Sequence, residues 1–96
     1  MPFDQFTPRA FTTSSIQNHV PSTSGVYGFS NAKEWIYIGE TGDLRAALFA
    51  HLAEVNTPLK RRQPTGFVFE ECASAVRHGR QDRLVHEYEP FCNRRH

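Results

Sequence analysis

The sequence predicts an α+β domain, a small three-stranded antiparallel sheet flanked by helices, with a short N-terminal extension. Two strand-like segments surround a polar turn at residues 31–33, which predicts a β-hairpin. Apolar residues then recur at helical spacing from residue 44 to residue 55. A third strand segment and a second long helix follow, so the predicted order is strand, strand, helix, strand, helix.

Residues 1–21 are predicted to form the extension and residues 22–96 the domain itself. The extension carries three phenylalanines, and a short helix is expected over residues 16–20, with Ser14 or Ser15 as its cap. A chain of 96 residues forms one domain, and a domain of this size buries only about 60–65% of its unfolded surface. The extension or a partner is therefore expected to add burial.

The predicted hairpin covers residues 25–39. Alternation of side chains along its second strand places Trp35 and Tyr37 on one face of the sheet. The same alternation places Ile36 and Ile38 on the opposite face. Because both faces are apolar, we expect this strand to be covered on both sides.

The clearest helix pattern lies in residues 43–55, with Asp43 as the candidate N-cap. Its apolar face consists of Leu44, Ala47, Leu48, His51, Leu52 and Val55. After a polar segment with the basic run Lys60-Arg61-Arg62, residues 65–70 predict the third strand. Residues 74–88 predict the last helix, with Ser74 as its candidate cap.

Composition excludes several classes of protein. With 39% hydrophobic residues the chain predicts a packed fold, and its apolar runs are too short to span a membrane. Cys72 and Cys92 are interpreted as reduced core residues of a cytoplasmic protein, since no secretory signal precedes them. A net charge of +1 neither requires nor excludes a polyanionic partner.

Three short motifs carry chemical information. Gly25-Val26-Tyr27 and Tyr37-Ile38-Gly39 lie on the two predicted hairpin strands, and Leu84 to Asn93 closes the last helix with a proline-containing exit. Together they resemble the GIY-YIG nuclease family, and the resemblance extends from about Ser22 to Asn93. It implies the same small antiparallel sheet flanked by helices.

The family's activity is metal-assisted hydrolysis of a phosphodiester, which needs a base, a cation, a metal carboxylate and phosphate donors. By resemblance Tyr27 is the candidate base and Tyr37 positions the phosphate. His51 matches a histidine that some members carry one turn after their catalytic arginine. Asn93 matches an asparagine that follows the last helix. These four residues are the candidate catalytic set.

The sequence departs from the family at both charged positions. The position of the catalytic arginine holds Ala47, and the position of the metal-binding glutamate holds Gln81. A neutral amide is a much poorer ligand for a hard cation than a carboxylate. The resemblance therefore implies an incomplete site that holds no metal, and no cofactor is expected; Mg²⁺ or Mn²⁺ is needed if the protein is active.

Basic residues on the predicted helices are candidates for nucleic-acid binding. Arg77, Arg80 and Arg83 recur along one side of the last helix, and Arg45 lies near the start of the first long helix. Such a stripe attracts phosphate backbones, but a solvated helix face paired with acidic residues is an equal alternative. DNA, RNA or a protein are thus the candidate partners, and no membrane is expected.

Three interpretations of function remain open at this point. The first is a nuclease-like protein with an impaired site that binds nucleic acid or protein. The second is an active endonuclease in which neighbouring residues replace the missing charges. The third is a protein-interaction module, in which Tyr27 and Tyr37 are ordinary sheet aromatics and His51 is a core residue.

Overall fold

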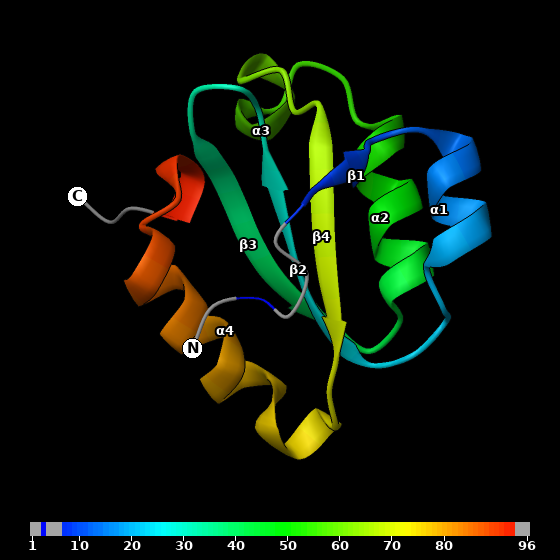
Figure 1. The fold of residues 1–96 in the computed structure, drawn as a ribbon, viewed down its shortest axis with the longest axis vertical. Helices are drawn as coiled ribbons and strands as arrows, with labels where there is room; N and C mark the ends of the chain where they lie inside the picture. Colours follow the sequence, from blue (N-terminus) through cyan, green and yellow to red (C-terminus); the bar gives the residue numbers. More distant parts are fainter. Residues whose placement is uncertain (1–2, 4–6, 94–96) are drawn as a thin grey trace.

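The computed structural model describes Phe3 and residues 7–93. Four helical segments of α type and one 3₁₀ turn accompany the strands of this part of the chain (Figure 1). The strands are β1 (Arg9–Ala10), β2 (Gly25–Ser30), β3 (Trp35–Thr41) and β4 (Gly66–Glu71). The helices are α1 (Thr13–His19), α2 (Leu44–Ala53), α3 (Pro58–Arg61), α4 (Ser74–Tyr88) and the 3₁₀ turn η1 (Phe91–Asn93).

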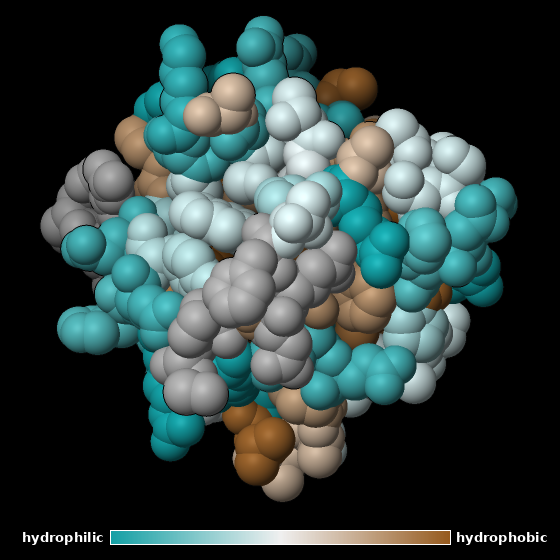
Figure 2. All heavy atoms as spheres, viewed as in Figure 1, coloured by the Kyte–Doolittle hydropathy of each residue, from teal (hydrophilic) through white to brown (hydrophobic). Residues whose placement is uncertain are grey.

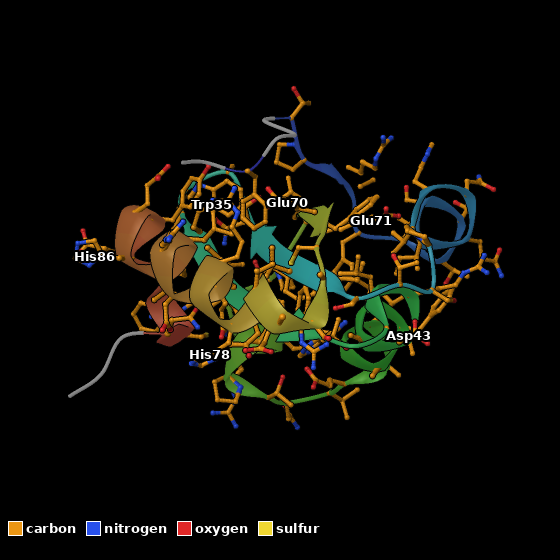
Figure 3. The ribbon with its side chains drawn as sticks, turned by 90° about the horizontal axis from the view of Figure 1, so that it is seen from below. Trp35, Asp43, Glu70, Glu71, His78 and His86 are labelled. Carbon is orange, nitrogen blue, oxygen red and sulfur yellow. The ribbon has the colours of Figure 1, made fainter. Side chains whose placement is uncertain are left out.

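The strands form one antiparallel sheet in the order β1-β4-β2-β3. The central strand β2 is buried along its whole length. Helix α4 covers one face of the sheet, while α1 and α2 cover the other, so that the sheet lies between two helical layers (Figure 3). Strand β3 forms the outer edge, and η1 lies alongside it.

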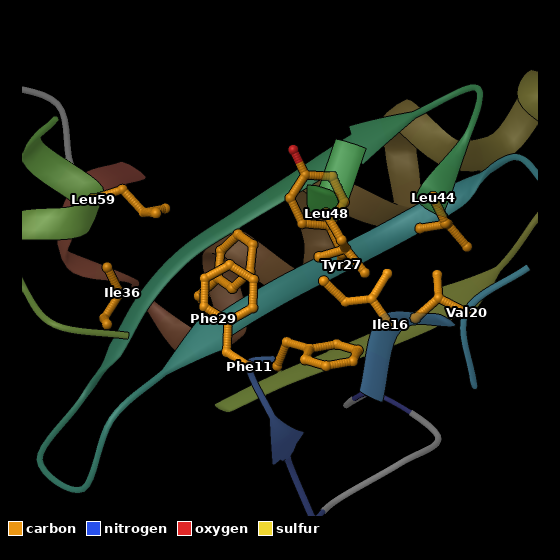
Figure 4. Packing of buried hydrophobic residues seen from close by; sticks show 10 residues of the cluster. Phe11, Ile16, Val20, Tyr27, Phe29, Ile36, Leu44, Leu48 and Leu59 are labelled. Carbon is orange, nitrogen blue, oxygen red and sulfur yellow. The ribbon is translucent and has the colours of Figure 1, made fainter. Parts of the chain in front are cut away.

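Each face of the sheet has its own hydrophobic core. Figure 4 shows the larger one, in which side chains of β2 pack against α1 and α2. The smaller one contains Phe3, Val26, Ile38, Val68 and Leu84 and lies beneath α4. The alternation of β2 explains this division, because Val26 points to one face and Tyr27 to the other.

The α+β fold class predicted from the sequence is confirmed, but the described sheet has four strands rather than three. The additional strand, β1, is two residues long and comes from the predicted extension. Arg9 pairs with Phe67, and Ala10 with Gly66. Phe3 and Phe11 are buried, so these extension residues contribute to the cores. The domain boundary after residue 21 stays a prediction.

Two predicted helix caps are wrong. Helix α1 is capped by Thr12, whose hydroxyl accepts a hydrogen bond from the Ser15 amide at 3.2 Å, so the helix begins earlier than expected. The N-cap position of α4 is Ala73, which offers no side-chain oxygen, and Ser74 lies inside the helix. Asp43 caps α2 as predicted and accepts from the Ala46 amide at 3.0 Å.

The predicted faces of β3 are also wrong at one end. Trp35 packs with the core beneath α4, whereas Ile36 and Tyr37 both pack with the core beneath α2. The cause is a register shift opposite Phe29 and Ser30, which breaks the simple alternation of the strand. Within the part of the chain that the structure describes, no helix is long and apolar enough to cross a membrane.

Candidate functional site

The two tyrosines of the hairpin meet where β2 and β3 pair. Tyr27 lies directly opposite Gly39 in the register. A Cβ atom at position 39 would lie 2.6 Å from Cζ of Tyr27 and 2.8 Å from Cε2 of Tyr37. Glycine at this position therefore lets the Tyr27 ring lie across β3 beside Tyr37, with 6.2 Å between the ring centroids.

A chain of hydrogen bonds leads from Tyr27 into helix α2. The hydroxyl of Tyr27 lies 2.9 Å from Nε2 of His51, and Nδ1 of His51 lies 3.2 Å from Oε1 of Glu54. A carboxylate only accepts, so Nδ1 of a neutral ring carries the proton. Nε2 is then the acceptor, and Tyr27 donates to it. Thr57 also donates to Glu54, at 3.3 Å, which fixes the far end of the chain.

Burial governs the acidity of both phenols. Tyr27 is only 4% exposed, and burial raises its pKa far above the ordinary value, with a further rise from the neighbouring Tyr37. Burial also raises the pKa of Tyr37. Both phenols therefore remain protonated at neutral pH, and Tyr27 acts as a hydrogen-bond donor rather than as a phenolate.

A hollow of about 240 Å³ opens beside this chain. Tyr37, His51, Glu54 and Cys92 line it together with Thr57, Pro58 and Leu59 at the start of α3. Burial raises the pKa of the Cys92 thiol. Among the described residues, the lining thus contains one carboxylate and no lysine or arginine side chain. This hollow is called the tyrosine cleft below.

Gln81 and Asn93 lie at the outer edge of β3. Asn93 accepts a hydrogen bond from the Ile38 amide at 2.7 Å and donates to the Ile38 carbonyl at 2.9 Å. Gln81 donates to the same carbonyl at 3.1 Å. The two side chains complete the hydrogen bonding of an edge strand, which a glutamate could not do in the same way, because a carboxylate cannot donate.

A cluster of charged side chains lies between α4 and β3, one helical turn before Gln81. Glu40 accepts from Nε of Arg77 at 2.9 Å and lies 2.7 Å from Nδ1 of His78. Hydrogen bonds from Arg77 and then His78 hold the pKa of Glu40 below its usual value. Arg77 also donates to Ser24, at 3.1 Å. The carboxylate nearest to Gln81 along β3 is therefore already paired with Arg77 and in contact with His78.

These donors do not fit a divalent metal. The family position for a carboxylate holds the Gln81 amide, which is bonded to Ile38, and Glu40 is engaged by Arg77. The described residues contain no group of three or more His, Cys, Asp or Glu side chains that could hold a metal ion. Magnesium and manganese prefer oxygen ligands with negative charge, which this edge does not supply.

The other candidate cations lie on α2 and α4, outside the tyrosine cleft. Arg45 faces α1 and donates to the Gln17 carbonyl at 2.8 Å. Arg80 forms a double hydrogen bond with Glu70, at 2.7 and 2.8 Å. Arg83 is exposed on α4. None of these three residues lines the tyrosine cleft.

Comparison with solved structures gives a clear relationship of fold. A point variant of the GIY-YIG N-terminal endonuclease domain of UvrC from Thermotoga maritima, bound to its catalytic divalent cation, superposes with a TM-score of 0.72 at 22% identity. The match covers 88% of this chain and 100% of that domain. The same domain bound to magnesium gives 0.72 at 21% identity, with 86% of this chain covered.

The architecture is therefore GIY-YIG-like, as the motifs predicted. No family model and no curated protein matches the sequence. The likeness is one of fold, and the role of each site residue comes from the geometry of this chain.

The structure brings together three of the four candidate catalytic residues, Tyr27, Tyr37 and His51. Asn93 is held at the edge of β3 by Ile38. Their catalytic roles stay predictions. Sequence reasoning missed Glu54, although its position three residues after His51 was a usable signal, since such residues are neighbours at a helix end.

Glu40 was missed too. Its partner Arg77 is 37 residues away in the sequence, and nothing local indicates that the two side chains meet.

Proposed function

We propose that this GIY-YIG-fold protein has an incomplete nuclease site and acts by binding nucleic acid rather than by cleaving it. The observation that supports this most is the state of the metal position. Gln81 is neutral and its amide group is used to bond the Ile38 carbonyl. A carboxylate ligand for a metal is thus replaced by a structural hydrogen bond.

Position 47 supports the same proposal. Ala47 lies on α2 one turn before His51 and packs against the core. Its methyl group supplies no charge to a phosphate in the tyrosine cleft. The loss of one preorganised stabiliser of charge commonly lowers the rate by about 10²–10³. With both charged members replaced, little hydrolysis is expected.

A second candidate function is an active endonuclease, and the Tyr27-His51-Glu54 chain favours it. Glu54 orients His51 so that its Nε2 can accept a proton from Tyr27. This is an arrangement suited to general base catalysis. It lacks the cation that stabilises the developing charge on phosphorus, and Arg45 and Arg77 are bonded elsewhere.

A cleavage assay distinguishes the two functions. The wild-type protein, Tyr27→Phe and the double variant Ala47→Arg with Gln81→Glu are incubated with supercoiled plasmid in Mg²⁺ or Mn²⁺. We expect no nicking by the wild type and a gain of nicking by the double variant. Wild-type nicking that Tyr27→Phe abolishes would overturn the proposal. An active wild type insensitive to Tyr27→Phe indicates a contaminating nuclease, which a second purification must remove.

Nucleic-acid binding is tested separately, by the anisotropy of labelled DNA and RNA at several salt concentrations. Salt-sensitive binding without cleavage supports the proposal, because release of counterions makes phosphate binding weaken as salt rises. Absence of binding to every nucleic acid tested would reject it and favour a protein partner.

A further inference from the structure

Asn31 joins two segments that are far apart in the sequence, and a hollow lies where they meet. The turn between β2 and β3 and the end of α3 enclose a space of about 380 Å³. Its lining residues are Asn31, Ala32, Lys33, Glu34, Arg61, Arg62, Gln63 and Thr65. We call this space the basic hollow. Figure 1 shows α3 and this turn at the same end of the sheet, away from the start of α4.

The charge of the basic hollow is positive. It is lined by three cations, Lys33, Arg61 and Arg62, and by one carboxylate, Glu34. Glu34 lies 3.5 Å from Arg62, so its charge is already balanced. Lys33 and Arg61 are exposed, and within the described part of the chain no side-chain ion pair engages them. In Figure 2 the corresponding end of the molecule is largely hydrophilic.

The walls of the hollow are held in place by hydrogen bonds. The side chain of Asn31 donates to the Arg62 carbonyl at 2.7 Å and accepts from the Lys33 and Glu34 amides at 2.8 and 3.0 Å. The Thr65 amide donates to the Ser30 carbonyl at 3.0 Å. These hydrogen bonds fix the backbone of the walls, so that binding orders mainly the exposed side chains of Lys33 and Arg61.

The hollow also adjoins the tyrosine cleft. Its Arg62 guanidinium lies 3.3 Å above the ring of Phe91, and the next residue, Cys92, lines the cleft. On α3 the cations Arg61 and Arg62 face the hollow, while Leu59 lines the cleft. A phosphate chain in the basic hollow therefore lies beside the Arg62-Phe91 pair, which borders the tyrosine cleft through Cys92.

We propose that the basic hollow binds the phosphodiester backbone of a single-stranded nucleic acid and leads it to the tyrosine cleft. This inference rests on the proposed nucleic-acid binding and assigns its surface. A concave site with two cations that no ion pair of the described residues engages, Lys33 and Arg61, and a third, Arg62, paired with Glu34, suits a flexible strand. A duplex needs phosphate contacts along a longer surface, and two of the three arginines of α4, Arg77 and Arg80, pair with Glu40 and Glu70.

The test measures binding of a labelled single strand of about 16 nucleotides. This is the upper end of the range of strand lengths that one small single-strand-binding domain of the OB fold covers. Arg61→Gln and Lys33→Gln are compared with Arg83→Gln, which removes one exposed charge from α4. We expect each of the first two variants to weaken binding. Each should also reduce the slope of the logarithm of the binding constant against the logarithm of the salt concentration by about 0.7. Arg83 represents the predicted basic stripe of α4, so Arg83→Gln tests that competing surface, and we expect it to change both quantities less than Arg61→Gln or Lys33→Gln does. Thermal unfolding verifies that all variants are folded.

The outcomes separate the inference from the function on which it rests. Equal weakening by Arg83→Gln and Arg61→Gln would overturn the assigned surface while nucleic-acid binding survives. Tighter binding of a duplex of the same sequence would overturn the single-strand assignment. Full competition by inorganic phosphate at the concentration of the strand would show a site for free phosphate instead. Absence of binding by the wild type would reject the proposed function together with this inference.

Discussion

The substitution Asn93→Ala tests whether the edge of β3 is held as the structure shows. It removes the hydrogen bonds of 2.7 and 2.9 Å to the Ile38 backbone. Each is expected to contribute about 0.5–1.5 kcal/mol to the free energy of unfolding, and an orphaned buried amide costs about 1–3 kcal/mol. The Ile38 carbonyl keeps its bond from Gln81, so we expect a total loss of about 2 kcal/mol.

For a domain of this size, 1 kcal/mol corresponds to about 4–8 °C in the melting temperature. A loss of about 2 kcal/mol therefore lowers the melting temperature by about 8–16 °C. Urea denaturation gives the free energy itself and shows whether the unfolding remains two-state. The matched control is Asn18→Ala, which changes an exposed asparagine of α1 and is expected to stay within about 0.5 kcal/mol of the wild type.

A double-mutant cycle with Gln81→Ala sharpens the test. Either single variant leaves the Ile38 carbonyl one donor, and only the double variant leaves it unpaired. The double variant should thus lose at least about 0.5 kcal/mol more than the sum of the single variants. Strict additivity, or a loss below about 0.5 kcal/mol for Asn93→Ala, would refute the view that these amides complete the strand edge.

Two further predictions concern the same region. Gly39→Ala places a Cβ atom 2.6 Å from the Tyr27 ring. We therefore expect the free energy of unfolding, measured by urea denaturation, to fall by about 1–3 kcal/mol, and the Tyr27-His51 hydrogen bond to be disrupted in NMR spectra. Unchanged stability would contradict the close approach of Gly39 and Tyr27. Arg77 and then His78 hold the pKa of Glu40 below its usual value, while Glu40 and then Asp82 raise the pKa of His78. His78→Asn should therefore reduce stability between the ordinary pKa values of 4.5 and 6.5 and change nothing well above that window. A difference that persists at alkaline pH would contradict the pairing of His78 with Glu40.

The direction of this pH effect follows from the two shifts. The lowered pKa of Glu40 adds stability above its ordinary value, and that stability is lost as the pH falls through the folded pKa. The raised pKa of His78 adds stability below its ordinary value, which is lost as the pH rises through the folded pKa. Both contributions coincide only in the mildly acidic range.

Local patterns predicted the elements that depend on local chemistry. The Asp43 cap and most of the predicted face of α2 need only residues within a few positions of each other, and both are present. Val55 is the exception, because α2 ends at Ala53 and Val55 is 82% exposed beyond it. The faces of Trp35 and Ile36 depend on a register shift against another strand, which no alternation within β3 reveals. Strand β1 is two residues long, too short for any periodicity, and it exists because β4 offers it an edge.

The candidate site was likewise predictable only where it depends on residues close together in the sequence or on one hairpin. Tyr27 and Tyr37 lie on the two strands of the predicted hairpin, and they meet in the structure because the antiparallel register is regular from Gly25 to Phe29. The pairing of Arg77 with Glu40 was not predictable, since it depends on where α4 crosses β3. The structural use of Gln81 also depends on that crossing.

Where α4 crosses the sheet, Arg77 and Arg80 pair with carboxylates of β3 and β4, whereas their spacing indicated a surface for nucleic acid. Arg77 bonds Glu40 on β3, and Arg80 bonds Glu70 on β4, so both tie the helix to the sheet. A guanidinium already engaged by a carboxylate offers less to a phosphate, because a second anion must compete with the first. Stability should therefore respond to changes at Arg80, whereas affinity for nucleic acid should respond to changes at Arg61.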